Sequence, residues 1–389
     1  MLHERRDGIN YTKPTKRPWH VHREGQPERQ TTQYIMKEDA YRAAGVDIDA
    51  ANQTVARYQS ILDQHADPRV LRGIGGFSGS FSLEGFREPV LVASTDGVGT
   101  KVIVAATLGR YSGIGADLVN HCINDLLCSN AQPLFFLDYL AMGKLDADAA
   151  EAIVGGIANA CRENGMALLG GETAEMPGVY TPPLFDLAGT IVGALERRDM
   201  LDLASVSAGD AIVGLPANGL HTNGYSLARK VLAQARWSEL VAQGGATTIG
   251  DALLAIHPSY LRIVRAIQRS DVTIKSMAHI TGGGLIDNVA RALPDQLAAR
   301  FDAASWRVPP VLALVAREAR LSLDEAYRTL NMGVGFCLVV SPQDAQRAVR
   351  AANEALAAQP INGAVGAAAI VGAVEPRHQC GASVIVGGA

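Results

Sequence analysis

Apolar and polar residues follow two alternating patterns along most of the chain. Short, nearly continuous apolar runs, typical of buried β-strands, alternate with longer stretches whose apolar residues recur at helical spacing. This alternation predicts an α/β fold. The expected strands are Pro89–Thr95, Pro133–Ala141, Met166–Leu169, Leu187–Leu195, Ala211–Leu215, Gly335–Val340 and Ala368–Val374. The expected helices are Gly115–Cys128, Asp146–Glu163, Tyr225–Arg236, Pro258–Arg269, Leu285–Leu293 and Leu323–Thr329.

The sequence divides into a polar extension and two parts that are expected to fold. Residues 1–36 are rich in charge, proline and glutamine and show no apolar periodicity, which indicates a disordered extension. Met36 stands directly before the first periodic sequence and is therefore an alternative start. A polar, turn-rich segment, Arg197–Gly209, separates two series of expected elements. Because 389 residues suit about two domains, we expect an N-terminal domain at 37–205 and a C-terminal domain at 206–389.

Composition restricts the class of protein. Hydrophobic residues make up 48% and charged residues 19%, as in a soluble globular protein with a sizeable core. The net charge of −4 lacks the basic field of a general nucleic-acid binder, so we expect no nucleic-acid partner. The five cysteines form no CxxC pair and no secretory segment is found, which favours the reducing cytoplasm. The uncharged run at 355–374 is interrupted by Pro360 and Gly363, so we expect the end of a helix, a turn and a buried strand there and no membrane span.

The first candidate site is the run Asp96–Lys101, at the end of a buried-looking strand. A carboxylate in this place could hold Mg²⁺, while Gly97 and Gly99 would let backbone N–H groups approach phosphate oxygens. Lys101 would add a positive charge. The spacing is not that of a Walker A loop. An Asx-turn that only ends the strand is the alternative interpretation.

Polar residues also form a stripe along the expected helix Gly115–Cys128. The stripe contains Asp117, His121, Asn124 and Cys128, at spacings that place them on one face. Asp125 borders the stripe. A solvated helix face is the simpler explanation for Asp117 alone. Asp125, however, would complete a two-carboxylate Mg²⁺ site with Asp96, since Mg²⁺ prefers carboxylate and phosphate oxygens.

Two acidic residues, Glu172 and Glu175, lie in the run Gly170–Gly178 after an expected short strand. On a glycine-flanked loop they could bind a metal ion or an amino group. Loop carboxylates are usually only solvated, so this signal is weak by itself.

Two further runs precede expected helices. His221–Asn223 offers an imidazole and polar side chains at a helix N-terminus, which suits an anion or a developing oxyanion. Thr222 or Asn223 could equally be an ordinary N-cap. His279–Gly284 contains three consecutive glycines, and their loss of backbone entropy on folding argues for a close approach of the backbone to a phosphate.

Taken together and in this order, the motifs resemble the phosphoribosylformylglycinamidine cyclo-ligase (AIR synthetase) family of purine biosynthesis. The resemblance covers roughly residues 39 to 389, and the run GGETAEMPG is highly specific. The matching runs are Ala40–Asp49, Gly75–Phe77, Asp96–Lys101, Asn124–Asp125, Pro133–Tyr139, Gly170–Gly178, His221–Leu227, His279–Gly284 and Tyr327–Gly335.

The resemblance implies a fold and an activity. The fold would be two α/β domains with mixed sheets, of the AIR-synthetase-like ATP-binding superfamily, in a homodimer formed through the N-terminal half. The activity would be the ATP- and Mg²⁺-dependent closure of formylglycinamidine ribonucleotide (FGAM) to 5-aminoimidazole ribonucleotide (AIR), with release of ADP and phosphate. The chain would thus be a C–N ligase of the cytoplasm, with a small-molecule substrate and no membrane partner.

The resemblance also implies roles for individual residues. The implied catalytic residues are His221, Asp96 and Lys101. The implied metal ligands are Asp96, Asp125 and Glu172. The implied nucleotide contacts are Gly75, Gly76, Phe77, Gly97, Gly99, Thr100, Lys101, Asn124, Thr222 and Asn223. In one departure, relatives often carry a lysine in the helix before Gly75, whereas the segment Ala56–His65 offers only Arg57.

Families with the same architecture fit less well. A selenophosphate synthetase needs a cysteine or selenocysteine in its glycine-rich N-terminal region, yet the first cysteine is Cys122. The hydrogenase-maturation relative needs a cysteine at the extreme C-terminus, yet Cys380 is followed by further residues. The runs at 40–50 and 170–178 point away from thiamine-monophosphate kinase. A catalytically silent nucleotide-binding protein would be expected to lose its carboxylates, and Asp96, Asp125, Glu172 and Glu175 are all present.

Overall fold

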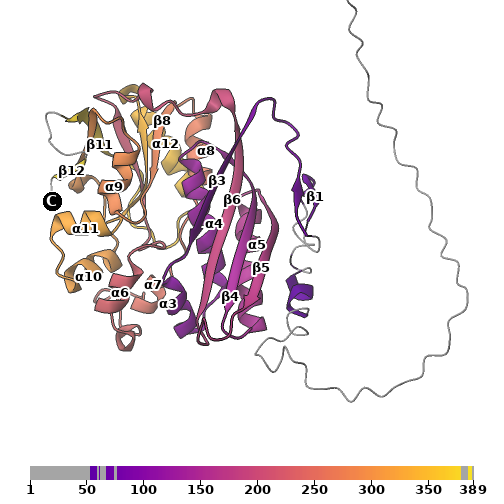
Figure 1. Ribbon diagram of the computed structural model, residues 1–389. Coiled ribbons are helices and arrows are strands. Elements are labelled where there is room, and N and C mark those ends of the chain that lie inside the picture. Colours follow the sequence, from indigo (N-terminus) through magenta and orange to yellow (C-terminus); the bar gives the residue numbers. More distant parts are fainter. Residues whose placement is uncertain (1–52, 59–60, 62–66, 74–76, 378–383, 388–389) are drawn as a thin grey trace, which may run out of the picture. The chain divides into compact units, whose positions relative to one another are not determined.

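Two β-sheets, one from each half of the chain, organise the computed structural model (Figure 1). The structure describes residues 53–58, 61, 67–73, 77–377 and 384–387. Several predicted features lie outside the described residues, namely the extension at 1–36, the run Ala40–Asp49 and the two nucleotide contacts Gly75 and Gly76. Helices and strands alternate and both sheets contain parallel and antiparallel pairs, so the predicted α/β fold with mixed sheets is confirmed.

The first half forms a four-stranded sheet in the order β3-β6-β4-β5. Its strands are β3 (Pro89–Gly97), β4 (Gln132–Met142), β5 (Ala167–Glu175) and β6 (Phe185–Glu196). Only β4 and β5 are parallel. A separate antiparallel pair contains β1 (Val70–Arg72) and β2 (Ser80–Phe81).

Three helices accompany this sheet, α3 (Lys101–Leu108), α4 (Ser112–Leu127) and α5 (Ala147–Glu163). Helices α4 and α5 lie side by side on one face of the sheet (Figure 1). Helix α5 begins at the N-cap Asp146, whose carboxylate accepts hydrogen bonds from the backbone N–H groups of Asp148 and Ala149. It ends before Gly165, which has a φ of +68°.

Two glycines set the distance between α4 and α5. A Cβ atom on Gly115 of α4 would lie 2.2 Å from the backbone oxygen of Ile153. A Cβ atom on Gly156 of α5 would lie 2.2 Å from the backbone oxygen of Ser112. The backbones of the two helices therefore touch, and this contact fixes the position of α4 and of the polar residues that it carries.

The second half forms a six-stranded sheet in the order β12-β9-β11-β7-β10-β8. Its strands are β7 (Ala211–Pro216), β8 (Ile274–His279), β9 (Leu297–Asp302), β10 (Val334–Val340), β11 (Ala369–Pro376) and β12 (Val384–Gly387). Only β12 and β9 are parallel. Residues 197–210 connect β6 to β7 and contain two short 3₁₀ helices, Arg197–Asp199 and Leu203–Ser205.

Seven helices belong to the described residues of the second half. They are α6 (Tyr225–Val231), α7 (Ile249–Leu253), α8 (Leu261–Arg269), α9 (Gly284–Arg291), α10 (Pro310–Glu318), α11 (Leu323–Thr329) and α12 (Pro342–Ala358). Helices α8 and α12 share one hydrophobic core with α4, α5 and both sheets. Helices α6, α9, α10 and α11 pack in a second core that includes the six-stranded sheet. The shared core joins the two halves and holds α4 against the second half.

Each predicted strand and helix has a counterpart, with differences at some boundaries. The predicted helix Tyr225–Arg236 is wrong beyond Val231, where a short 3₁₀ helix replaces it. The acidic run after Leu169 was expected to be a loop, but it continues as strand β5 to Glu175. Of helix α12 only the C-terminal end was predicted, and helices α3, α7 and α10 and strands β1, β2, β8, β9 and β12 were not predicted. Among the described residues, no helix has both the length and the apolar character that crossing a membrane requires.

Candidate functional site

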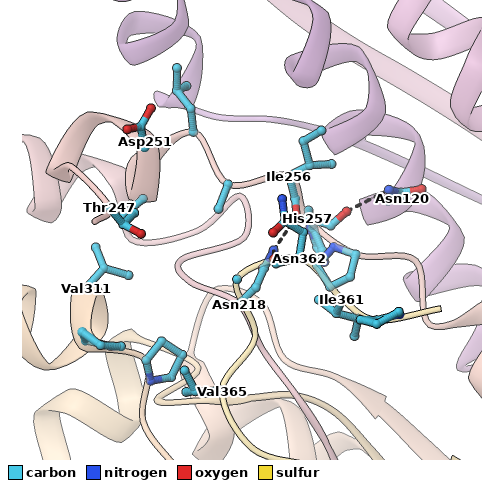
Figure 2. Close-up of a pocket in the computed structure, with 18 of the residues that line it drawn as sticks. Asn120, Asn218, Thr247, Asp251, Ile256, His257, Val311, Ile361, Asn362 and Val365 are labelled. Carbon is cyan, nitrogen blue, oxygen red and sulfur yellow. Dashed lines mark hydrogen bonds between the residues drawn. The ribbon is translucent and has the colours of Figure 1, made fainter. Parts of the chain in front are cut away.

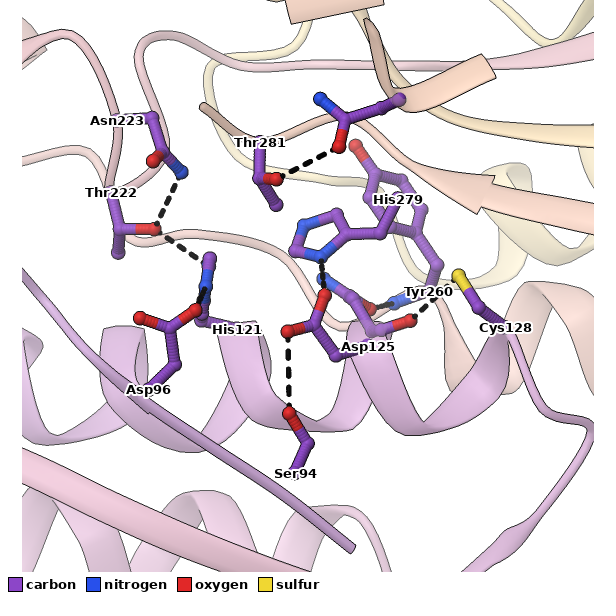
Figure 3. Close-up of polar contacts among 12 residues, drawn as sticks. Ser94, Asp96, His121, Asp125, Cys128, Thr222, Asn223, Tyr260, His279 and Thr281 are labelled. Carbon is purple, nitrogen blue, oxygen red and sulfur yellow. Dashed lines mark hydrogen bonds and ion pairs between the residues drawn. The ribbon is translucent and has the colours of Figure 1, made fainter. Parts of the chain in front are cut away.

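The structure brings Asp96 and Asp125 together, as the sequence predicted. Asp96 lies near the end of β3, and Asp125 lies on α4, which packs against that strand. Ligand-capable atoms of Asp96, Asp125 and His121 all lie within 4.8 Å of one another (Figure 3). The side chains of Asp96 and Asp125 remain 45% and 30% exposed. A cation could therefore reach both carboxylates from solvent.

A buried histidine holds each carboxylate. Nε2 of His121 lies 2.6 Å from Oδ2 of Asp96, and Nδ1 of His279 lies 2.8 Å from Oδ1 of Asp125 (Figure 3). The backbone N–H of Gly97 donates a hydrogen bond of 2.7 Å to Oδ1 of Asp96. Because His279 belongs to the second half of the chain, the pair Asp125–His279 joins the two halves at this point.

These contacts keep both carboxyl groups ionised. Burial alone would raise the pKa of Asp96, but the hydrogen bond and the charge of His121 outweigh it and lower that pKa. Burial would likewise raise the pKa of Asp125, but the hydrogen bond and the charge of His279 outweigh it, so the pKa of Asp125 is lowered. Two ionised carboxylates that face one space are the ligand type that Mg²⁺ prefers, so the residues present fit this ion.

Glu172 lies away from this pair, contrary to its expected place among the metal ligands. It is an exposed residue of β5, opposite Tyr139 of β4 in the register of the sheet. Strand β5 is three positions away from β3, which corresponds to about 14 Å. Within one chain, therefore, Glu172 does not join Asp96 and Asp125. Its neighbour Glu175 accepts a hydrogen bond of 2.8 Å from the backbone N–H of Leu145.

Lys101 also lies elsewhere than expected. Its side chain is fully buried, and its Nζ lies 2.8 Å from the carboxylate of Asp117. The same ammonium group donates to the backbone oxygens of His221 at 3.2 Å and Ala255 at 2.7 Å. Lys101 begins α3, so its side chain points inward toward α4 instead of offering a free charge to a phosphate. Its contacts join α3 and α4 to two segments of the second half.

Three residues of the predicted stripe, Asp117, His121 and Asn124, prove to be buried on α4, whereas Cys128 follows the helix and is half-buried. Asn124 is fully buried, and its amide donates to the backbone oxygen of Pro258 at 2.9 Å. Its Oδ1 accepts the backbone N–H of Tyr260 at 2.9 Å. Asn124 thus binds the protein's own backbone in this structure, whereas the sequence suggested a nucleotide contact. Asp117 likewise accepts the backbone N–H of His257 at 2.7 Å, so it is not part of a solvated face.

The segment from His221 to Ser226 meets the glycine loop that follows Asp96. Oγ1 of Thr222 lies 2.7 Å from Nδ1 of His121, and the amide of Asn223 donates to the same Oγ1 at 3.4 Å (Figure 3). Oγ1 of Thr100 lies 3.3 Å from Oγ of Ser226. The predicted contact residues of the two halves therefore lie at one junction.

His221 is buried at this junction in a strained backbone conformation. Its φ is +62°, and neither ring nitrogen has a hydrogen-bond partner. Its ring stacks on that of His257 with 4.2 Å between the centroids. Burial holds the pKa of His221 well below its usual value, so the ring is neutral. A neutral imidazole can accept or donate a proton, but it cannot supply a fixed positive charge.

His257 is a residue of this region that sequence reasoning missed. It precedes Pro258 in an irregular segment, and no spacing connects it to other histidines. Its Nε2 lies 3.1 Å from Nε2 of His279, and its Nδ1 lies 3.4 Å from Oγ1 of Thr222. Burial holds the pKa of His257 well below its usual value. Only the fold, which packs this segment against α4, reveals its place.

Of the remaining predicted nucleotide contacts, the structure describes Phe77, Gly97, Gly99 and Thr100. Gly97 is the last residue of β3, Gly99 and Thr100 lie in the turn between β3 and α3, and Gly99 has a φ of +56°. Phe77 is fully exposed. Arg57, the one basic residue of the segment 56–65, pairs with the carboxylates of Asp148 at 2.8 Å and Glu151 at 3.1 Å.

A cavity of about 860 Å³ lies beside this junction (Figure 2). Asn120 and His257 line it, together with Asn218 and the segment 359–363 of the second half. Asp96 and Asp125 do not line it. The carboxylate pair and the cavity are thus neighbouring features, separated by the histidines. The ligand chemistry of the carboxylates, and not the size of the cavity, locates the candidate metal site.

Comparison with known sequence families finds a match in each half of the chain. Residues 86–195 match the family described as "AIR synthase related protein, N-terminal domain". Residues 207–377 match the corresponding C-terminal domain.

Solved structures with the same fold are distant in sequence. Escherichia coli HypE superposes with a TM-score of 0.61 at 16% identity, covering 86% of this chain and 93% of HypE. A thiamine-monophosphate kinase from Stenotrophomonas maltophilia gives a TM-score of 0.58 at 20% identity, covering 88% and 97%. A hydrogenase maturation protein HypE solved in complex with ATP gives 0.60 at 19% identity, covering 85% and 90%. At these identities the similarity shows the fold alone.

Curated relatives are much closer. The phosphoribosylformylglycinamidine cyclo-ligase of Xanthomonas oryzae pv. oryzae is 48% identical over 341 residues, which cover 87% of this chain and 97% of the relative. The enzyme of the same name from Carboxydothermus hydrogenoformans is 46% identical over 319 residues, covering 81% and 92%. The chain therefore belongs to the phosphoribosylformylglycinamidine cyclo-ligase family.

Proposed function

We propose that this protein is an ATP-dependent cyclo-ligase that converts FGAM to AIR and releases ADP and phosphate. The 48% identity to a curated cyclo-ligase over 97% of its length supports this assignment. The single structural observation that carries it is the pair of ionised carboxylates, Asp96 and Asp125, at the junction of the two halves.

The proposed chemistry has two steps. The formyl oxygen of FGAM attacks the γ-phosphorus of ATP, the bond to the bridging oxygen breaks, and ADP leaves. The neighbouring amine of the substrate then attacks the formyl carbon, the carbon–oxygen bond breaks, and phosphate leaves with that oxygen. The formamide nitrogen and the attacking nitrogen each lose a proton, and a proton then moves from the ring CH₂ carbon to the imine nitrogen to give the aromatic aminoimidazole. Positioning and neutralisation of phosphate charge are the main tasks of an enzyme in such a reaction.

The residues of the junction suit these tasks. Asp96 and Asp125 would hold Mg²⁺, which neutralises charge on the ATP phosphates when it is bound. The backbone of Gly97–Thr100 would contact phosphate oxygens, with Thr222 and Asn223 facing it from the second half. Gly75, Gly76 and Phe77 are proposed as further nucleotide contacts from their sequence motif alone.

The buried basic groups have indirect roles in this proposal. Lys101 would position the junction through its ion pair with Asp117 and its bonds to two backbone oxygens. His221 would act near the reacting phosphoryl group as a neutral imidazole. Its strained backbone and its two unpartnered nitrogens are compatible with a ring that gains its partners when substrate binds.

Three broader expectations accompany the assignment. We propose that the chain is divided at about residue 205 into two AIR-synthetase-like domains. It would act in the cytoplasm, since purine synthesis draws on soluble substrates. It would form a homodimer through the exposed face of its four-stranded sheet.

A coupled assay tests the function directly. Purified protein is incubated with ATP, Mg²⁺ and FGAM, while ADP and AIR are measured together. ADP release should require FGAM and should match AIR formation in amount. Thiamine monophosphate, the substrate implied by the name of one structural neighbour, serves as the control. ATP turnover with that compound and none with FGAM would overturn the proposal.

A further inference from the structure

The side chains of three buried histidines lie together in a cluster to which the proposed reaction assigns no role. His121 comes from α4, His257 from the segment between α7 and α8, and His279 from the end of β8. Each offers one ring nitrogen, and these nitrogens lie within 4.8 Å of one another. The ring centroids of each pair are 5.0 to 5.3 Å apart. All three side chains are buried, so their nitrogens face one another and not solvent.

Carboxylates orient two of the three rings. Nε2 of His121 donates its hydrogen to Asp96, and Nδ1 of His279 donates its hydrogen to Asp125. The other ring nitrogen of each histidine points away from its carboxylate: Nδ1 of His121 lies 2.7 Å from Oγ1 of Thr222, and Nε2 of His279 lies 3.1 Å from Nε2 of His257. A carboxylate that accepts from the outer nitrogen is the usual support of a metal-binding histidine.

Asn124 determines the tautomer of the third ring. The backbone contacts of Asn124 fix its amide, because Oδ1 accepts from Tyr260 and Nδ2 donates to Pro258. The second N–H of that amide lies 3.1 Å from Nε2 of His257, which must therefore be an acceptor. The hydrogen of His257 then sits on Nδ1, which faces Oγ1 of Thr222 at 3.4 Å.

Nε2 of His257 and Nε2 of His279 are 3.1 Å apart, so both nitrogens face one point inside the cluster. Two imidazole nitrogens bound to one tetrahedral Zn²⁺, with Zn–N bonds of about 2.0 to 2.1 Å, lie about 3.3 Å apart. The observed spacing is close to that value.

We propose that His121, His257 and His279 form a binding site for a divalent transition metal of the zinc class, separate from the carboxylate site proposed for Mg²⁺. Neutral imidazoles favour zinc-class ions over Mg²⁺, which prefers oxygen ligands. Metal binding exchanges the hydrogen bonds of Asn124 and Thr222 to these rings for metal bonds. Because the ligands come from both halves, the ion cross-links α4 to the second half. The proposal does not depend on the proposed reaction.

Cobalt serves as the test probe, because Co²⁺ bound in a tetrahedral site absorbs visible light strongly. The full chain, freed of metal by a chelator, is titrated with Co²⁺ and then with Zn²⁺. We expect one tetrahedral Co²⁺ per chain, displacement by Zn²⁺ and no displacement by excess Mg²⁺. Zn²⁺ alone should also raise the melting temperature. The variants His257→Gln and His121→Gln should each weaken binding of both metals by roughly tenfold or more.

Histidines elsewhere in the chain provide the matched control. A variant with His20→Gln, His22→Gln and His378→Gln should keep the cobalt spectrum and the affinity of the parent chain. If one cluster variant fails to fold, as judged by circular dichroism, the other decides the result. Absence of tetrahedral cobalt binding in the full chain would overturn the proposal. So would binding that survives in a folded cluster variant, or binding that is lost in the control.

Discussion

At the scale of single residues, the proposed metal site makes Asp96 the most informative position. Asp96→Asn keeps the size of the side chain but removes one ligand charge. Turnover should fall by about 10²-fold or more, since positioning and charge neutralisation dominate phosphoryl transfer. The stabilisation that Mg·ATP gives in a thermal melt should shrink. Without ligands, the change should stay within about 1 kcal/mol, because the side chain is 45% exposed and its bond to His121 is screened by solvent.

The control for Asp96→Asn is Asp324→Asn, which removes an exposed carboxylate from α11. It should keep full turnover and the full response to Mg·ATP. Near-normal turnover of Asp96→Asn with an intact Mg·ATP response would remove Asp96 from the metal site. Asp96 would then only form the turn at the end of β3.

A second prediction at this scale concerns Asp138, a buried carboxyl group of β4. Burial raises its pKa from 3.8 to about 7, with a further contribution from the charge of Glu172. The folded protein therefore holds this proton more tightly than the unfolded chain. The resulting stability is fully present below pH 3.8 and is lost as the pH rises through about 7. The slope is at most about 1.4 kcal/mol per pH unit.

The matching variant is Asp138→Asn, which has the same shape and does not titrate. A larger residue is not suitable, because Asp138 packs against Gly171 so closely that a Cβ there would lie 2.1 Å from Oδ1. In denaturant titrations the variant should be more stable than the parent near pH 8, and the difference should disappear near pH 4. Parallel stability curves at all pH values would show that Asp138 does not carry the proton.

The sequence could predict part of the site at this scale. Asp96 and Asp125 were predictable as a pair, because one ends a buried strand and the other borders a polar stripe on the next helix. The role of Lys101 could not be predicted, because nothing in the sequence shows that its side chain turns inward to Asp117. His257 gave no signal, since its neighbours in space come from α4 and β8.

At the scale of elements, the contact between α4 and α5 positions the site, and it depends on Gly156. Replacing this residue with alanine would place a Cβ 2.2 Å from the backbone oxygen of Ser112, so the helices must separate. We expect Gly156→Ala to lower the free energy of unfolding by about 1 to 3 kcal/mol. It should also reduce turnover, because α4 carries Asp125. Denaturant titration and the coupled assay measure the two effects.

The neighbouring residue supplies the control. A Cβ on Gly155 would make only an ordinary contact of 3.8 Å, with the side chain of Ile61. Gly155→Ala should therefore be neutral, or stabilising by up to about 1 kcal/mol, because alanine favours the helix. Equal effects of the two substitutions would mean that the helices are not held at this distance by Gly156.

The pattern of apolar residues predicted an element correctly where the pattern and its flanking residues are typical of only one type, helix or strand. Helix α5 was predictable because its N-cap Asp146 and the terminating Gly165 flank an amphipathic stretch. The continuation of β5 through Gly170–Glu175 could not be predicted in this way, because glycines and acidic residues are typical of loops. Its pairing with β4 supplies the hydrogen bonds that overrule this local preference.

At the scale of the whole molecule, the sequence indicated two similar-sized halves but not how they meet. The common core of α4, α5, α8 and α12 and the hydrogen bond between Asp125 and His279 are contacts between distant parts of the chain. No local pattern encodes such contacts. Only the resemblance to a family suggested that the loops after Asp96 and before α6 would lie together.

The exposed face of the four-stranded sheet bears on the proposed homodimer. Helices α4 and α5 cover one face, while Leu91 on β3 and Tyr139 on β4 are 59% and 38% exposed on the other. Sheets with an uncovered apolar face commonly pair with another surface. The pair of β1 and β2 reaches part of this face, through the contact of Phe81 with Phe135. The area around Leu91 is the part of the face on which the proposed contact between two copies rests.

Leu91→Glu should therefore convert the protein to a monomer, because a buried and unpaired carboxylate at the interface would be strongly unfavourable. Light scattering during size-exclusion chromatography measures the mass, which should be twice that of the chain for the parent protein. Leu240→Glu introduces the same charge at a leucine that is 49% exposed in the second half, and it should leave the dimer intact. A dimer that survives Leu91→Glu, or a parent protein that is monomeric at micromolar concentration, would contradict an interface on this face of the sheet. If Leu91→Glu yields a folded monomer, its turnover with FGAM then tells whether the site at Asp96 and Asp125 works within a single chain.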